Sequence, residues 1–269
     1  MITHISYSQY NTYTNCPRSW YLGKVRKAEE KQTWYIPIGT AVHSMVEAYL
    51  ADPSQLPSAE EFFYPLISAQ MQVEPDLSKW LAGGSREAPA TEDRALQQVK
   101  DCFARALEFL DDIDVWEVEL DVSWNLPGLE VPVKAYADVI GEHKKHGPTI
   151  LDWKTGSSKP KDAFQLETYA ALLLNPTNKS YEIHDFTGVW AMLKPGTSVA
   201  KPIDLSDVKP AEVGALYQAV YEKMKAKLYP TKHGFNCNFC FHQENCLLTA
   251  GPTARAVYYD RAHEDGYPF

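Results

Sequence analysis

Three segments between residues 115 and 153 have the side-chain pattern of β-strands. In 115–122 four apolar residues alternate with three acidic ones, which is the two-residue period of a strand with one buried face. The segments 131–140 and 149–153 give a second and a third strand, and the polar stretch 141–148 is the turn between them. The buried face of the first strand is expected to hold Trp116, Val118, Leu120 and Val122.

Helices are predicted on both sides of these strands. Apolar residues at helical spacing predict helices at 39–50, 91–111, 162–174 and 209–228, with a further strand at about 183–193. A shorter helical stretch, 6–27, breaks near Cys16, because Pro17 disfavours helical geometry in the residue before it. This order predicts an α/β or mixed α+β fold, with a central mixed sheet flanked by helices. On the last helix the apolar stripe holds Val213, Leu216, Val220, Met224 and Leu228.

Composition limits the classes of function. The chain has 269 residues, of which 45% are hydrophobic and 23% charged, values ordinary for a globular protein. No apolar run approaches the roughly 20 residues that span a membrane. Met1–His4 lacks the basic segment of a secretory signal, so we expect a cytoplasmic protein. The net charge of −9 argues against tight, non-specific coating of DNA. Cleavage stays open, because a metal-dependent nuclease needs carboxylates and the metal attracts phosphate.

Asp138, Asp152 and Lys154 are the candidate catalytic residues. Asp152 and Lys154 are two apart on a predicted strand, so their side chains leave one face of it. Asp138 lies on the preceding strand across a short turn, within reach of the same metal ion as Asp152. Two carboxylates suit Mg²⁺ or Mn²⁺, and a neighbouring lysine can hold an attacking water or stabilise transition-state charge. The set fits phosphodiester hydrolysis.

Four short motifs in sequence order resemble those of RecB-like nucleases of the PD-(D/E)XK superfamily. The segment 151–156, Leu-Asp-Trp-Lys-Thr-Gly, resembles the family's Asp-x-Lys-Thr-Gly core, and 137–140 resembles its preceding acidic motif. Gln165 and Tyr169 match the Gln-x-x-x-Tyr motif. The segment 39–43, Gly-Thr-Ala-Val-His, matches the Gly-x-x-x-His motif. The resemblance implies a restriction-endonuclease-like fold.

The resemblance also implies a role for each matching residue. His43, Asp138, Asp152 and the backbone carbonyl of Trp153 would bind Mg²⁺ or Mn²⁺. Lys154 would position or activate the water, while Gln165 and Tyr169 would orient the phosphate backbone or the lysine. Glu47 and Glu119 are weaker candidates, since a solvated glutamate explains each of them equally well.

Four of the five cysteines form a second constellation. Clustered cysteines in a cytosolic protein indicate metal ligands before disulfides. Cys237, Cys240 and Cys246 form a compact trio, one ligand short of a tetrahedral set, and Cys16 is the evident fourth. Cys102 adjoins the apolar stripe of helix 91–111 and is expected in the core.

The arrangement of one cysteine before the nuclease core and three behind it resembles the iron–sulfur nucleases, which include AddB and CRISPR-associated nucleases. The segment 15–18, Asn-Cys-Pro-Arg, resembles their N-terminal Cys-Pro-Arg segment. The resemblance implies a 4Fe–4S cluster on Cys16, Cys237, Cys240 and Cys246. Two alternatives stay open: structural Zn²⁺ on the same thiolates, or replacement of one cysteine by His233 or His242.

The predicted organisation is a single nuclease domain over 1–269. Its core covers about 39–50 and 91–228, a partly helical insertion covers 51–90, the cluster-binding ends cover 6–27 and 229–249, and a tail covers 250–269.

The predicted activity is a DNA exonuclease for recombination, repair or replication, possessing no helicase motif of its own. Its expected partners are single-stranded DNA or DNA ends and a helicase or recombination protein, in a bacterial, archaeal or phage-infected cell. A structure-selective or flap endonuclease and a non-catalytic DNA-end-binding adaptor are the alternatives.

Overall fold

The computed structural model describes residues 2–82, 88–174, 185–198 and 200–246. Two compact units emerge. The sheet unit comprises Met1–Tyr7 and Thr33–Gln218, and the cysteine unit comprises Ser8–Gln32 and Ala219–Phe269. The expected single domain stays a prediction, and the tail 250–269 lies outside the described residues. Within the described ranges, no helix is long and apolar enough to cross a membrane.

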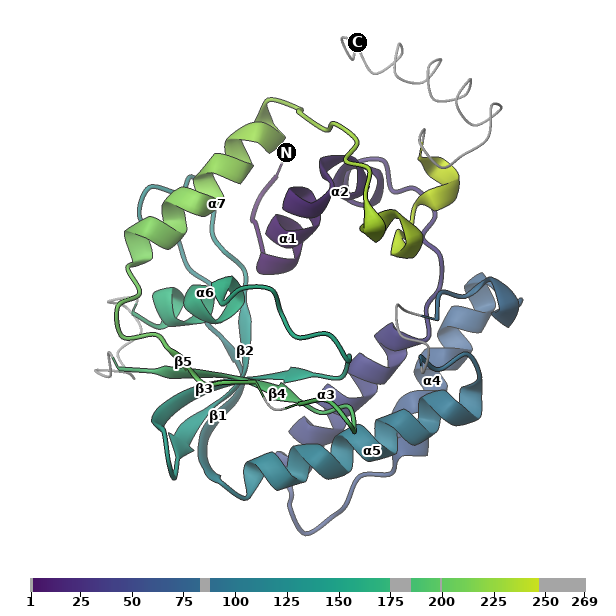
Figure 1. Ribbon diagram of the computed structural model, residues 1–269, viewed down its shortest axis with the longest axis vertical. Coiled ribbons are helices and arrows are strands. Elements are labelled where there is room, and N and C mark those ends of the chain that lie inside the picture. Colours follow the sequence, from purple (N-terminus) through teal and green to yellow (C-terminus); the bar gives the residue numbers. More distant parts are fainter. Residues whose placement is uncertain (1, 83–87, 175–184, 199, 247–269) are drawn as a thin grey trace. The chain divides into compact units, whose positions relative to one another are not determined.

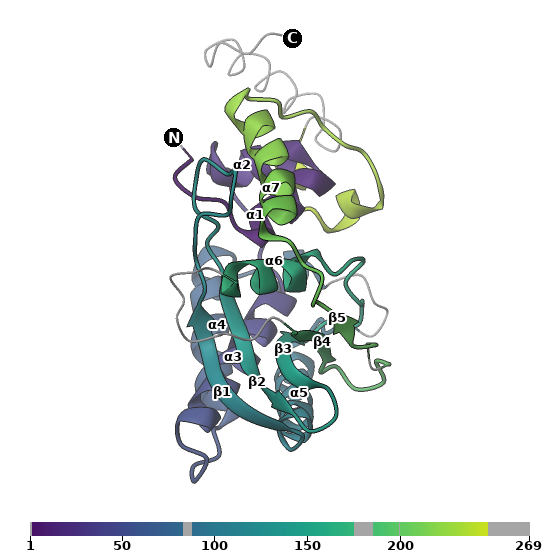
Figure 2. The same cartoon turned by 90° about the vertical axis from the view of Figure 1, so that its left-hand side faces the viewer.

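The sheet unit is built on five strands in the order β1-β2-β3-β4-β5. The pairs β1/β2, β2/β3 and β4/β5 are antiparallel, whereas β3/β4 is parallel, and Figure 2 shows the long β1 and β2 side by side. The mixed sheet confirms the predicted fold class. The strands are β1 (Ile113–Asp121), β2 (Tyr136–His143), β3 (Gly147–Lys154), β4 (Thr187–Met192) and β5 (Ile203–Asp204).

Helices cover both faces of this sheet (Figure 1). On one side lie α3 (Tyr35–Ala51), α4 (Ala59–Val73) and α5 (Glu92–Leu110). On the other, α6 (Phe164–Leu173) packs on β3 and β4. The chain passes from β3 through α6 to the parallel strand β4, which is the crossover that a parallel pair requires.

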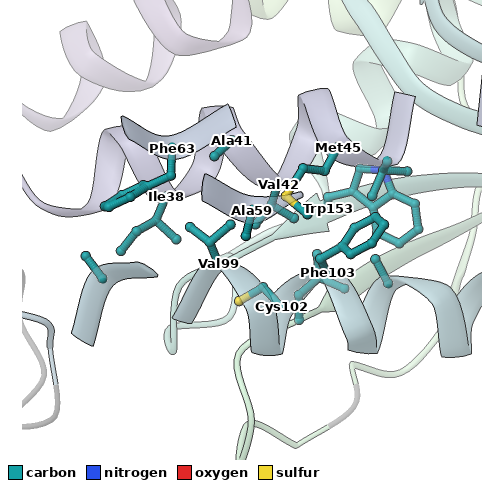
Figure 3. Packing of buried hydrophobic residues seen from close by; sticks show 14 of the residues in the cluster. Ile38, Ala41, Val42, Met45, Ala59, Phe63, Val99, Cys102, Phe103 and Trp153 are labelled. Carbon is teal, nitrogen blue, oxygen red and sulfur yellow. The ribbon is translucent and has the colours of Figure 1, made fainter. Parts of the chain in front are cut away.

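The main core joins α3, α4 and α5 to the sheet (Figure 3). Helix α5 begins after Thr91, whose hydroxyl accepts a hydrogen bond from the Arg94 amide at 3.4 Å, a favourable N-cap. Cys102 on this helix is fully buried, as predicted. The insertion 51–90 is more regular than predicted, since Phe63 of α4 is buried in the same core; residues 83–87 lie outside the described part.

Three details of the sequence interpretation were wrong. The strand predicted at 131–140 is shifted, because β2 runs from Tyr136 to His143. A register shift between Val115 and Glu117 breaks the expected alternation, so Trp116 is exposed rather than buried. On α7 (Pro210–Lys225), Tyr217 is fully buried while Leu216 is exposed, and Leu228, predicted on the same stripe, lies beyond the end of the helix and is exposed. The Tyr217 hydroxyl lies 3.1 Å from that of Thr168, which satisfies its polar atom in the core.

The cysteine unit combines two N-terminal helices with two short 3₁₀ helices. Helix α1 (Tyr7–Asn15) ends before Cys16, which is extended, and α2 (Pro17–Lys24) begins at the proline, so the predicted break is confirmed. The 3₁₀ helices are Phe235–Phe239 and Gln243–Asn245. Tyr229 stacks on Tyr21 with 4.7 Å between ring centroids, and the Lys31 amide donates to the Phe241 carbonyl at 3.0 Å.

Candidate active site

Three neighbouring strands, β1, β2 and β3, each carry an acidic residue at the same level of the sheet. Val139 pairs with Leu151, and the same antiparallel register places Asp138 on β2 opposite Asp152 on β3. Glu119 on β1 lies opposite Asp138, since the residues on either side of it pair with the neighbours of Asp138. Directly opposed residues in a sheet lie about 4.5–5.5 Å apart. The strand register therefore places three acidic residues that are distant in sequence at one level of the sheet.

Asp138 is a buried carboxyl group at the centre of this row. Only 7% of its surface is exposed, and its Oδ2 accepts a hydrogen bond from the Trp153 amide at 2.8 Å. Burial, together with the nearby charge of Asp152, raises the pKa of Asp138 to about 7. Burial of a carboxylate beside another carboxylate costs free energy until a cation or a proton compensates it.

His43 approaches the row from α3. Its Nδ1 lies 3.6 Å from Oε1 of Glu119 and 3.6 Å from Oδ1 of Asp138. Burial lowers the pKa of His43, but contact with Glu119 and the charges of Asp138 and Asp152 outweigh it, so the net pKa is raised. The ligand atoms of His43, Glu119 and Asp138 all lie within 4.8 Å of one another. Oxygen and imidazole donors at this spacing fit a divalent cation.

Four further side chains form a closed ring of polar contacts. Lys154 pairs with Oδ2 of Asp152 and donates a hydrogen bond to Oε1 of Gln165 at 3.0 Å. The amide nitrogen of Gln165 donates to the Tyr169 hydroxyl at 2.8 Å, and that hydroxyl donates to Oδ1 of Asp152 at 3.4 Å. The ring fixes the lysine ammonium beside the buried carboxylate.

The Asp152 carboxylate is not fully satisfied by protein groups. It is 2% exposed, and its Oδ2, although paired in charge with Lys154, forms no hydrogen bond of good geometry within the described residues. The ammonium of Lys154 also lies 4.9 Å from the centroid of the Trp190 ring. A buried carboxylate whose only cationic partner among the described residues is one lysine fits a site that also receives a metal ion.

Comparison with known proteins agrees with this geometry. Residues 4–247 match the PD-(D/E)XK nuclease superfamily. The chain belongs to this superfamily. PD-(D/E)XK nucleases use divalent metals, and the His43, Glu119 and Asp138 group suits one. Family and site together support a metal-dependent nuclease.

Two similar proteins come from bacteriophages. The Gene 69 proteins of Mycobacterium phages D29 and L5 are each 26% identical to this chain, over 267 and 285 residues, covering 90% of this chain and 95% of each relative. Among solved structures, the crystal structure of SSO0001 matches with a TM-score of 0.36 and 13% identity, covering 70% of this chain and 82% of that one.

The structure brings together the side chains that the PD-(D/E)XK motifs single out. His43 and Asp138 lie in the metal-fitting group with Glu119, a group that does not include Asp152. Asp152 is close enough for its charge to raise the pKa of both His43 and Asp138, and Lys154, Gln165 and Tyr169 form the ring around it. Their roles, and that of the Trp153 carbonyl, stay predictions.

The two weaker glutamate candidates separate in the structure. Glu47 is exposed, whereas Glu119 lies within the metal-fitting group. The predicted strand bounds carried no signal for this: an antiparallel hairpin of 115–122 with 131–140 places Glu119 opposite Lys134, and only the observed register brings Glu119 opposite Asp138.

All four predicted cluster cysteines belong to the cysteine unit. Each is partly exposed. Burial raises the pKa of the Cys240 thiol, and Cys246 and Cys16 add to this. In the part of the chain that the structure describes, no three cysteine sulfurs lie within 4.8 Å of one another.

The two histidines considered as replacement ligands differ in surroundings. His242 is 2% exposed, with Nδ1 3.3 Å from the Glu29 carbonyl oxygen and Nε2 3.6 Å from Oε1 of Glu30. Both of its ring nitrogens therefore have polar partners. His233 is exposed.

Proposed function

We propose that the protein is a Mg²⁺- or Mn²⁺-dependent exonuclease that hydrolyses phosphodiester bonds from DNA ends. One observation carries the proposal: the closed contact ring that joins Asp152, Lys154, Gln165 and Tyr169 next to buried Asp138. The ring holds a lysine beside carboxylates that can bind a cation, and these groups together suit phosphodiester hydrolysis. A protein that only bound DNA ends would gain nothing from holding two buried carboxylates together.

Each residue then takes a defined part. His43, Asp138, Asp152 and the Trp153 carbonyl hold the metal, which when bound supplies Lewis acidity and lowers the pKa of water. Lys154 holds the attacking water or the charge that develops on the phosphoryl oxygens. Gln165 orients Lys154 through the bond to its ammonium, and Tyr169 orients Gln165 and Asp152.

Action at DNA ends is supported by the resemblance of the motifs to those of end-processing nucleases. The test is digestion of labelled single- and double-stranded linear DNA beside covalently closed circles of the same sequence. We expect linear single strands to be degraded while circles persist. Equal rates on circular and linear DNA would indicate a structure-selective or flap endonuclease instead of an exonuclease. Binding to DNA ends without cleavage at any Mn²⁺ concentration would indicate a non-catalytic DNA-end-binding adaptor.

A second proposed feature is a 4Fe–4S cluster on Cys16, Cys237, Cys240 and Cys246. Its support is the shared unit and the influence of Cys246 and Cys16, which add to the raised pKa of the Cys240 thiol.

The zinc alternative is separated from the cluster by chemical analysis. Anaerobically purified protein is expected to be brown, with iron and acid-labile sulfide in about equal amounts. Colourless protein with one zinc ion per chain would support Zn²⁺ instead. Replacement of a cysteine by His242 is disfavoured, because both ring nitrogens of that histidine have partners.

The proposed context is DNA recombination, repair or replication in the cytoplasm of a phage-infected bacterium. The phage origin of the two similar Gene 69 proteins supports a phage version of the enzyme. A helicase or recombination protein is the proposed partner, since the sequence carries no helicase motif and any unwinding of duplex ends would come from a partner. Co-purification from infected cells tests this.

A further inference from the structure

Glu119 has a backbone conformation that is unusual for its residue type. Its φ is +48°, in the left-handed region that residues other than glycine, asparagine and aspartate rarely adopt. The strand nevertheless continues on both sides, since Val118 pairs with Val139 and Leu120 with Ala137. The departure is therefore local to one residue inside a paired strand. Such conformations persist where the surrounding structure enforces them, and they gather at functional sites.

The carboxylate of Glu119 lies close to two groups of the proposed metal site. Its Oε1 is 3.6 Å from Nδ1 of His43, and the same nitrogen is 3.6 Å from Oδ1 of Asp138. These separations exceed those of an N–H···O hydrogen bond, about 2.7–3.2 Å. They approach the roughly 3–3.4 Å between ligand atoms bound at about 2.1 Å to one cation. One ring nitrogen facing two carboxylates is the arrangement of three ligands around a shared position.

We propose that Glu119 is a further ligand of the divalent metal, completing a set with His43, Asp138 and Asp152. The inference rests on the proposed function and extends it, because the nuclease motifs assign no metal-binding role to β1. The left-handed backbone brings the Glu119 carboxylate to the site, so relaxing that backbone withdraws the ligand. Three carboxylates with one imidazole favour Mn²⁺ over Mg²⁺, because imidazole binds the softer ion better.

The test measures metal binding without DNA and without turnover. The full chain is titrated with MnCl₂ after chelator treatment, and the melting temperature is followed for wild type, Glu119→Gln, Glu119→Gly and the control Asp114→Asn. Asp114 lies on the same strand, is exposed and carries the same charge. We expect Glu119→Gln to raise the half-saturating Mn²⁺ concentration at least about tenfold, and Asp114→Asn to leave it unchanged.

The glycine variant separates a ligand from a merely structural residue. Glycine adopts positive φ freely, so Glu119→Gly should melt at a higher temperature than wild type in chelator, yet need at least about tenfold more Mn²⁺ for half-saturation, as Glu119→Gln does. Wild-type half-saturation in Glu119→Gln or Glu119→Gly would overturn the assignment while leaving the nuclease proposal intact. Absence of any Mn²⁺ response in wild type would overturn both.

Discussion

Replacing Asp138 by asparagine should stabilise the metal-free protein at alkaline pH. In the fold the pKa of Asp138 is raised from 3.8 to about 7, so the protonated carboxyl favours the folded state. The stability that it contributes is fully present below pH 4 and is lost as pH rises through 7. Three pKa units correspond to about 4 kcal/mol. Asparagine avoids this cost, because it is neutral and can still accept the hydrogen bond from the Trp153 amide.

The assay is thermal unfolding in chelator at pH 5 and pH 8. At pH 8 the Asp138→Asn variant should melt at least about 3 °C above wild type, since about 1 kcal/mol moves the melting temperature of a domain this size by 2–4 °C. At pH 5 the difference should shrink. With Mn²⁺ at pH 8 the order should reverse, because only the carboxylate binds the ion well. A variant no more stable than wild type in chelator at pH 8 would refute the reasoning, and exposed Asp114→Asn is the matched control.

Three further predictions concern the active-site ring, the pH dependence of Mn²⁺ binding and the cysteines. Gln165→Leu removes the acceptor that orients the lysine, so turnover on linear DNA should fall about 10- to 100-fold with unchanged Mn²⁺ affinity; unchanged turnover would contradict the role. Mn²⁺ should bind more tightly at pH 8 than at pH 6 by calorimetry, because His43 and Asp138 have raised pKa values and must lose protons to bind metal; a pH-independent affinity would contradict this. Cys16→Ala should lower iron content and melting temperature while Cys102→Ala, in the apolar core, keeps its iron; full iron in Cys16→Ala would remove that residue from the cluster.

Much of the sheet unit could be predicted because its signals are local. Alternation in 115–122 and the apolar segment around Asp152 identified strands, and Pro17 located the break between α1 and α2. Gln165 and Tyr169 are about one helical turn apart, and Asp152 and Lys154 are two residues apart on one strand. Spacing alone therefore indicated which of these side chains share a face. These features depend on neighbours in sequence and need no knowledge of packing.

The features that were missed depend on contacts between strands. At the register shift in β1, a Cβ atom on Gly141 would lie 2.3 Å from the Asp114 carbonyl oxygen. The bulge therefore requires a glycine that the sequence interpretation assigned to a turn. Glu119 was undervalued for the same reason: its proximity to His43 follows from the pairing of β1 with β2 and from one left-handed residue.

The most direct test of the account is cleavage of end-labelled linear DNA by wild type, Asp152→Ala and Lys154→Ala in a Mn²⁺ titration. Both variants lose groups that lie in the active-site ring, so their cleavage rates should fall by about 10²-fold or more at every Mn²⁺ concentration while their melting stays cooperative. Near-normal turnover by a well-folded Asp152→Ala variant would show that phosphodiester hydrolysis, if present, takes place elsewhere in the molecule.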